Sequence, residues 1–355
     1  MNKIKNIKYL ITGVIAALML FSCNFPEDDE FYIPFEAGVV VNPETITQLI
    51  IDRDELSIFE NALRILDEET GSKWLAKLNL PASDLTVFAP NDTAFQTWLD
   101  NSGISNISDL NPDDLELVIL NHILTGAFKS TEFVSGYTNS SALVGPRATE
   151  KNVSMYINTE NGVNINGESN VVEADLEANN GALHVVDKVI DLPVLLDFSI
   201  MDPSLSIFNE AVNFAQTARD DEGNGPNLRF RLVDPSASRT LFMPTDDAFA
   251  DLLLEVDSTG ATTLTDLDPS IVADAIFTHL IDIAAISSDE LIAIGRPFRI
   301  PSFKNELLFI DPNPDNLTVT DPNGRTANIL SNKIDLIAVN GIIHVIDKVL
   351  LAESE

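Results

Sequence analysis

The chain repeats itself, and this constrains its fold more than any other feature of the sequence. Four blocks of the first half return in the same order in the second half. "LSIFENAL" at 56–63 returns as "LSIFNEAV" at 205–212, "TVFAPNDTAF" at 86–95 as "TLFMPTDDAF" at 240–249, "DLNPDDLELVILNHIL" at 109–124 as "DLDPSIVADAIFTHLI" at 266–281, and "GALHVVDKVI" at 181–190 within "NGIIHVIDKVLL" at 340–351. Because the spacing between the copies grows only in small steps, the blocks predict two copies of one domain.

The repeat also predicts the domain boundaries. We expect a first domain at 44–192 and a second at 193–355, since Pro193 disfavours a strand at that point and a new helical pattern follows it. The longest segment found in only one copy, "RDDEGNGPN" at 219–227, has the glycine and charge content of a surface loop. The 355 residues are 45% apolar, enough for two domains that each bury a core.

Each copy begins with helical patterns and ends with strand patterns. After a strand that ends at Pro90, Asn91 is expected to cap a helix with Asp92 in its first turn, and the second copy repeats this at Thr245 and Asp246. In the third block Asn111 and Asp268 precede prolines at the first helical position, and an apolar face is expected to run on to Ile123 and Leu280. Short alternating runs at 153–158, 162–167 and 306–311 predict strands, so the class is α+β.

The N-terminus has the layout of a secretory leader. Three lysines precede an apolar run from Tyr9 to Phe21, which is shorter than the ~20 residues of a membrane-spanning helix. Ser22 and Cys23 then resemble the lipobox of bacterial lipoproteins, in which the cysteine becomes the acylated N-terminus. We therefore expect a signal peptide at 1–22, lipid attachment at Cys23 and an acidic tether at 23–43. An ordinary signal peptide or an uncleaved anchor is the alternative.

The charge of the chain excludes one class of partner. There are 55 acidic and 21 basic residues, a formal net charge of -34. A field of this sign repels phosphate backbones, so no nucleic acid is expected to bind. The single cysteine allows no intrachain disulfide bond.

The order of these blocks resembles that of the fasciclin (FAS1) domain: a "TVFAP" box, a helix that starts at proline and ends in histidine, and a closing "GxIHVIDKVL" box. The resemblance covers about 44–352 in two copies. It implies two β-sandwich wedges with packed helices, and extracellular adhesion or cell-surface binding in place of catalysis. The tyrosine that animal members carry before the helix-end histidine is Asn121 in one copy and Thr278 in the other. No integrin-type partner is therefore assigned.

The four histidines form the one constellation that suggests chemistry. Each copy has one histidine at the end of its expected helix, His122 or His279, and one in its closing strand, His184 or His344. An aspartate follows each strand histidine, Asp187 in the first copy and Asp347 in the second. Three of them could bind zinc, or an Asp and a His could form a hydrolase site, if helix and strand faced each other. The alternative is that each imidazole is buried and hydrogen-bonds the backbone. The apolar neighbours favour this second interpretation, so no catalytic residue, metal or cofactor is assigned. Calcium in the aspartate-rich loop 311–316 is a further alternative to ordinary turn chemistry.

These features predict a lipid-anchored binding or adhesion protein of the bacterial outer membrane, exposed at the cell surface, with a periplasm-facing orientation as the other option. The partners expected are the membrane, through the N-terminal lipid, and an unknown protein or glycan on a matrix or cell surface. A second hypothesis is an accessory lipoprotein of an outer-membrane complex that captures polysaccharide or other nutrients together with a transporter.

Overall fold

The computed structural model describes residues 44–145, 150–222 and 227–353, with the side chains of 217–222 excepted. The expected signal peptide (1–22), the tether (23–43) and the lipid site at Cys23 lie outside the described residues. Among the residues that are described, no helix has the length and apolar character needed to cross a membrane.

The first repeat places its main helices before most of its strands. Its elements are α2 (Ile46–Ile51), η1 (Asp54–Leu56), α3 (Ser57–Glu69), α4 (Trp74–Lys77), β1 (Leu85–Pro90), α5 (Asp92–Ser102), η2 (Ile107–Asp109), α6 (Pro112–Leu120), β2 (Ile123–Thr125), η3 (Ser130–Glu132), β3 (Gly136–Val144), β4 (Lys151–Asn158), β5 (Asn164–Ile165), β6 (Ser169–Ala178) and β7 (Gly181–Val186).

The second repeat follows the same order. Its elements are α7 (Phe198–Met201), η4 (Pro203–Leu205), α8 (Ser206–Glu222), α9 (Leu228–Val233), β8 (Arg239–Pro244), α10 (Asp246–Val256), η5 (Leu264–Asp266), α11 (Pro269–Thr278), β9 (Leu280–Ile281), α12 (Ser288–Ala293), β10 (Phe298–Pro301), β11 (Leu307–Asp311), β12 (Thr318–Thr320), β13 (Thr326–Asn328), β14 (Leu336–Ala338) and β15 (Gly341–Ile346).

In both repeats the first long strand lies parallel to the last. β1 pairs with β7 from Leu85–Gly181 to Pro90–Val186, and β8 pairs with β15 in the same way. The first repeat has one sheet in the order β2-β1-β7-β6-β5-β4-β3, while the second has two, β10-β11-β12-β13 and β14-β15-β8-β9. A bridge between Ile329 and Ile346 links the latter two sheets. The α+β class is therefore confirmed, and the parallel pairing of first and last strand is the same in both repeats.

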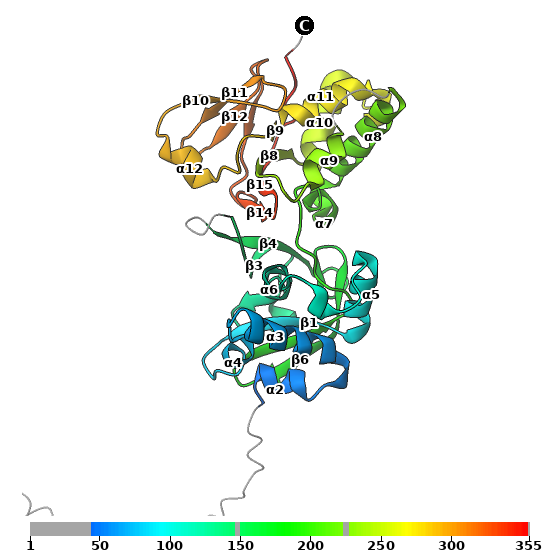
Figure 1. Ribbon diagram of the computed structural model, residues 1–355. Helices are drawn as coiled ribbons and strands as arrows, with labels where there is room; N and C mark the ends of the chain where they lie inside the picture. The colour runs from blue at the N-terminus through cyan, green and yellow to red at the C-terminus, as the bar shows by residue number, and fades with distance from the viewer. Residues whose placement is uncertain (1–43, 146–149, 223–226, 354–355) are drawn as a thin grey trace, which may run out of the picture. The chain divides into compact units, whose positions relative to one another are not determined.

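Each repeat has two cores, one on either side of its central strands. In the second repeat α8 to α11 lie on one side of β8 and β15, and β10 to β12 lie on the other (Figure 1). One core joins the helices to β8 and β15 through residues such as Phe208 and Ile276, and the other joins the outer strands through Leu308 and Val319. The strand that carries the histidine is thus buried on both faces, as its apolar sequence predicts.

The capping predictions are confirmed. The side chains of Asn91 and Thr245 accept hydrogen bonds from backbone N–H groups in the first turns of α5 and α10. Asp92 does more than favour the helix dipole, because its carboxylate accepts the backbone N–H of Ile58 at 2.8 Å and so ties the start of α3 to α5. Asp246 makes the same bond to Ile207 in the second repeat.

Two local expectations were wrong. The helices of the third block are shorter than the apolar face suggests: α6 ends at Leu120 and α11 at Thr278. The residues that follow leave the helix and form β2 and β9, because they complete an edge of the sheet against β1 and β8. In the insertion at 219–227, α8 continues through Glu222, because the segment has no glycine or proline before position 223.

Candidate functional site

The two histidines of the third block close the ends of their helices. Nδ1 of His122 donates to the carbonyl oxygen of Val118 at 2.7 Å, and Nε2 accepts the backbone N–H of Ile190 at 2.8 Å. His279 makes the same bonds to Ala275 at 2.7 Å and from Leu350 at 2.9 Å. Both rings are fully buried. Burial lowers the pKa of both imidazoles to about 4, although the carbonyl partner opposes this shift. Each histidine therefore joins a helix end to the segment after the last strand.

The two strand histidines use the opposite tautomer. Nε2 of His184 donates to the carbonyl oxygen of Phe128 at 2.9 Å, and Nδ1 accepts the backbone N–H of Asp175 at 3.1 Å. His344 is bonded in the same way, to Ile286 at 2.9 Å and from Asp335 at 3.4 Å. Burial is the main cause that lowers the pKa of both rings. These imidazoles hold a loop and a neighbouring strand against β7 and β15.

The aspartates of the closing box also bind the backbone. Asp187 accepts the backbone N–H of Asn170 at 2.7 Å and its side-chain amide at 3.0 Å. Asp347 accepts both groups of Asn328 at 2.7 Å. Each carboxylate therefore fixes the strand that approaches the end of the histidine strand.

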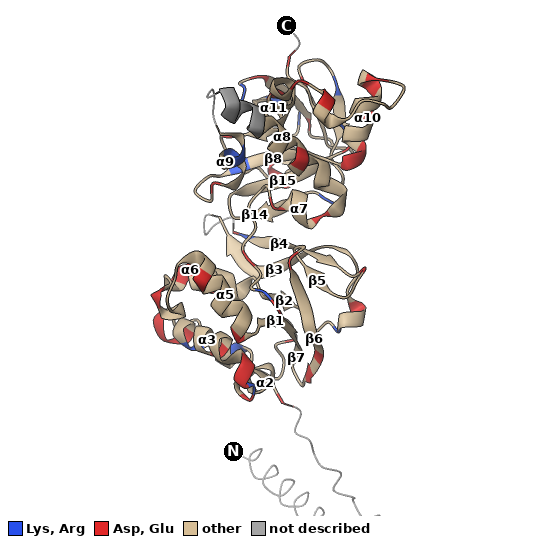
Figure 2. Cartoon of the chain, turned by 90° about the vertical axis from the view of Figure 1, so that its right-hand side faces the viewer, with Lys and Arg blue, Asp and Glu red and all other residues tan. Residues whose placement is uncertain are grey.

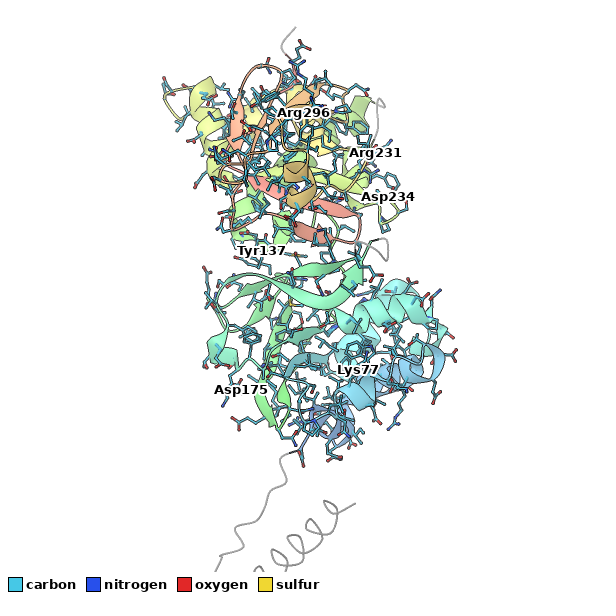
Figure 3. The ribbon with its side chains drawn as sticks, turned by 90° about the vertical axis from the view of Figure 1, so that its left-hand side faces the viewer. Lys77, Tyr137, Asp175, Arg231, Asp234 and Arg296 are labelled. Atoms are coloured by element: carbon cyan, nitrogen blue, oxygen red, sulfur yellow. The ribbon has the colours of Figure 1, made fainter. Side chains whose placement is uncertain are left out.

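The structure adds a pair of aspartates that sequence reasoning missed. The carboxylate of Asp175 (labelled in Figure 3) accepts the backbone N–H and the hydroxyl of Ser130, both at 2.6 Å. Asp335 accepts the same two groups of Ser288 in the second repeat. Both aspartates have positive φ angles, 61° and 55°. The sequence contained a signal for this pair, because each of the two aspartates stands nine residues before the strand histidine of its copy.

Two buried asparagines next to the histidine strands were missed as well. Asn180 accepts the backbone N–H of Ile46 at 2.9 Å and donates to the carbonyl oxygen of Leu78 at 2.7 Å. Asn340 accepts from Leu195 at 2.9 Å and donates to Leu232 at 3.0 Å. The "NG" that precedes both histidine strands was the available signal. Each side chain anchors the segment that enters its domain.

The glycine of each "NG" allows the parallel strand pair to form. A Cβ atom on Gly181 would lie 2.0 Å from the carbonyl oxygen of Leu85, and one on Gly341 would lie 2.2 Å from that of Arg239. No side chain fits at either distance, so the close approach of the first and last strands requires glycine here.

This geometry leaves the histidines no capacity for catalysis or metal binding. In each ring one nitrogen donates to a carbonyl oxygen and the other accepts a backbone N–H, so neither a free lone pair nor a free proton remains. Across residues 44–145, 150–222 and 227–353, no group of three His, Cys, Asp or Glu side chains is arranged to hold a metal ion. The structure thus does not bring His122, His184 and Asp187 together as a ligand set.

Other acidic segments have local partners. In the loop 311–316, Asn313 accepts the backbone N–H of Asp315 at 3.1 Å, which is ordinary turn chemistry. A recess of ≈ 160 Å³ contains Asp191 and Asp197, and burial raises the pKa of both carboxyls. Asp191 accepts the indole N–H of Trp98, and Asp197 accepts the backbone N–H of Val194 at 2.8 Å.

The two repeats contact each other through the sheet of the first. The hydroxyl of Tyr137 (labelled in Figure 3) donates to Asp202 at 3.0 Å, and its ring stacks on Phe198 with the centroids 6.1 Å apart. Burial, with the nearby charge of Asp202, raises the pKa of the Tyr137 hydroxyl. The backbone N–H of Ile337 donates to Oγ of Ser154 at 2.9 Å. This contact is built from both polar and aromatic groups.

Acidic residues outnumber basic ones by 55 to 21 in the chain. Figure 2 marks Asp and Glu positions in red along helices such as α3, α6 and α10, with few Lys or Arg positions in blue among them. Such an excess of acidic residues suits solubility and repels polyanions.

The comparisons with known proteins agree with this architecture. A model described as the fasciclin domain matches residues 57–193 and 207–352. Transforming growth factor-beta-induced protein ig-h3 of Sus scrofa is 26% identical over 318 residues, 87% of this chain and 38% of that protein. Protein sll1483 of Synechocystis sp. is 28% identical over 148 residues, 38% of this chain and 77% of that protein.

A solved structure of a FAS1 domain pair from the insect cell adhesion molecule fasciclin I gives a TM-score of 0.48 at 17% identity, covering 83% of this chain and 97% of that one. The chain thus spans well under half the length of its pig relative, and much of that protein has no counterpart here. Fasciclin domains typically serve adhesion and binding and are not enzymes. The two matches cover most of the sequence, and the chain belongs to the fasciclin family.

Proposed function

We propose that this protein is a lipid-anchored binding or adhesion protein on the outer membrane, with its two fasciclin domains exposed at the cell surface. The observation that carries the proposal is that the boxed histidines and aspartates of both copies all bind backbone groups. These histidines and aspartates thus serve the fold, and ligand recognition falls to the outer surfaces.

The anchoring part of the proposal is supported by the N-terminal sequence. Ser22 and Cys23 follow a short apolar run behind three lysines. Lasting attachment needs more than one acyl chain, since each buried methylene contributes only about 0.8 kcal/mol. In this proposal the acidic tether at 23–43 links the lipid to the first domain.

The binding part is supported by the pairing of the domains. Two similar domains on one membrane-held chain, repeated across a cell surface, raise the effective concentration of weak sites. Weak contacts to a protein or a glycan on a matrix or cell surface are therefore sufficient for adhesion.

The experiment compares cells that carry the wild-type chain, the Cys23→Ala variant and no chain. We expect wild-type protein in the outer-membrane fraction, digestion by protease added to intact cells, and adhesion to surfaces coated with matrix protein or glycan. Cys23→Ala should release the protein and abolish adhesion. Equal adhesion of all three strains would refute the binding role, and membrane retention of Cys23→Ala would refute the lipid anchor.

A further inference from the structure

The repeat allows the outer strands of the two domains to be compared residue by residue. Ile157 of β4 pairs with Ile165 of β5, and Ile310 of β11 pairs with Val319 of β12 at the same point of the ladder. Counting back along each strand, Tyr156 corresponds to Phe309 and Ser154 to Leu307. One strand further out, Tyr137 pairs with Tyr156 and Arg299 pairs with Phe309.

In the first repeat this outward face of the sheet is covered. Ser154 and Tyr156 are buried because the second repeat lies over them. Ile337 of β14 donates its backbone N–H to Ser154, and Phe198 of α7 stacks on Tyr137 beside Tyr156. Every residue from Val153 to Ile157 is consequently buried, whichever face it occupies.

In the second repeat no described residue covers the same face. Leu307 is 49% exposed and Phe309 38%, whereas Leu308 and Ile310 between and beside them are fully buried. We call the row of Arg299, Leu307, Phe309, Thr320 and Thr326 the outer face of β10–β13. It lies on the side of the domain opposite α8 to α11 (Figure 1).

The charge of this face differs from that of the rest of the chain. Its five residues include no carboxylate, and Asp311 stands only at the end of β11, although the chain has 55 acidic residues. Because each copy has a net charge of -34, the electrostatic repulsion between two copies is smallest when they meet through faces that lack carboxylates. An exposed apolar sheet face with a polar border is typical of an interaction site.

We propose that the outer face of β10–β13 binds the same face of a second copy of this chain, with the two sheets packed face to face about a twofold axis. A closed, self-complementary contact of this kind is the commonest arrangement of identical subunits. The axis would bring Leu307 and Phe309 of one copy against those of the other.

A head-to-tail contact, in which the first repeat of one copy covers the second repeat of another copy, is disfavoured. The first repeat carries Glu177 where the second has Ile337, and Arg53 where the second has Asp202. Such a stack would set Glu177 on Leu307 and Arg53 near Arg299. A carboxylate on an apolar side chain and two like charges are both costly.

The size of the face predicts a weak dimer. Four strands of three to five residues each span about 250 Å², well below the about 800 Å² per partner of a stable interface. The association should therefore appear at high protein concentration, and at the membrane, where tethering raises the effective concentration.

The test is sedimentation velocity of the purified full chain in non-ionic detergent over a wide concentration range. We expect a monomer–dimer equilibrium that Leu307→Asp weakens at least about tenfold, as for a charge placed in an apolar interface. Leu254→Asp on α10 is the matched control, because Leu254 is 50% exposed but lies outside this face. It should dimerise as the wild type does.

Three results would overturn the proposal: a wild-type chain that stays monomeric at the highest concentration, dimers that Leu307→Asp leaves unchanged, or oligomers that grow without limit as a head-to-tail contact requires. Melting curves of both variants should match that of the wild type, since both leucines are half exposed. If Leu307→Asp lowers the melting temperature, the same comparison is made with Phe309→Ser.

Discussion

Nζ of Lys333 lies 2.6 Å from Oδ2 of Asp202, a buried ion pair that also receives the hydroxyl of Tyr137 from the other repeat. The first repeat has the same pair with its charges exchanged, because Arg53 donates to both carboxylate oxygens of Glu173 at 2.8 and 3.0 Å. The ion pair is therefore a feature of each domain, and the bond from Tyr137 is added to it where the two repeats meet. Burial raises the pKa of Asp202, but bonds from Lys333 and Ser204 outweigh it and the net pKa is lowered.

Tyr137→Phe should weaken the contact between the repeats. It removes one hydrogen bond to a charged group, for which a loss of about 1.5–3 kcal/mol is expected. A double-mutant cycle with Asp202→Asn in urea unfolding isolates this coupling. Additive effects of the two substitutions would show that the bond is not formed.

His184→Ala should destabilise the protein and leave its metal content unchanged. The substitution opens a cavity and leaves the carbonyl of Phe128 and the N–H of Asp175 without their partner, which costs about 2–4 kcal/mol. His344→Ala should cost a similar amount, as its matched counterpart in the second repeat. Stoichiometric zinc in the purified wild type that is lost in His184→Ala would contradict the structural role.

Stability should fall as the pH drops below neutrality. The pKa of His122 and His279 is about 4 in the folded protein and about 6.5 in the unfolded chain. Between these values the unfolded chain binds protons that the folded one does not, so the free energy of unfolding decreases by roughly 3 kcal/mol per histidine as the pH falls from 6.5 to 4. Urea unfolding at several pH values measures this slope.

The control for this slope is His122→Gln, which cannot titrate. Its stability should be lower at pH 7 but should fall less steeply between pH 6.5 and 5, a range in which few carboxylates titrate. Parallel slopes for the variant and the wild type would show that His122 is not protonated on unfolding.

Gly181→Ala should prevent or strongly impair folding of the first domain. The added Cβ would meet the carbonyl oxygen of Leu85 at 2.0 Å, and only a separation of β1 from β7 could relieve this contact. Gly136 is the matched control, because its φ of 147° is close to the 154° of Gly181 but nothing lies within 4 Å of its Cβ position. Gly136→Ala should cost about 1–2 kcal/mol. Equal effects of the two substitutions would assign the cost to backbone strain alone.

The repeat made most of the fold predictable. The blocks located the caps at Asn91 and Thr245 and the buried strands that carry the histidines, since these depend on short-range chemistry and apolar patterning. What the sequence could not show was where α6 stops, because Ile123 is apolar in a helix and in an edge strand alike. The partners of Asp175 and Asn180 also stayed hidden, because they lie far away in the sequence and most of the bonds are to backbone groups, which no side-chain pattern encodes.

The most direct test of the account is a long-range ¹H–¹⁵N NMR spectrum of the four imidazoles, recorded across pH and with added zinc. We predict that His122 and His279 are neutral with the proton on Nδ1, that His184 and His344 are neutral with it on Nε2, and that none changes between pH 7.5 and 6 or on addition of zinc. A ring that titrates near pH 6.5, or one whose signals shift with stoichiometric zinc, would contradict the claim that these side chains serve only the fold.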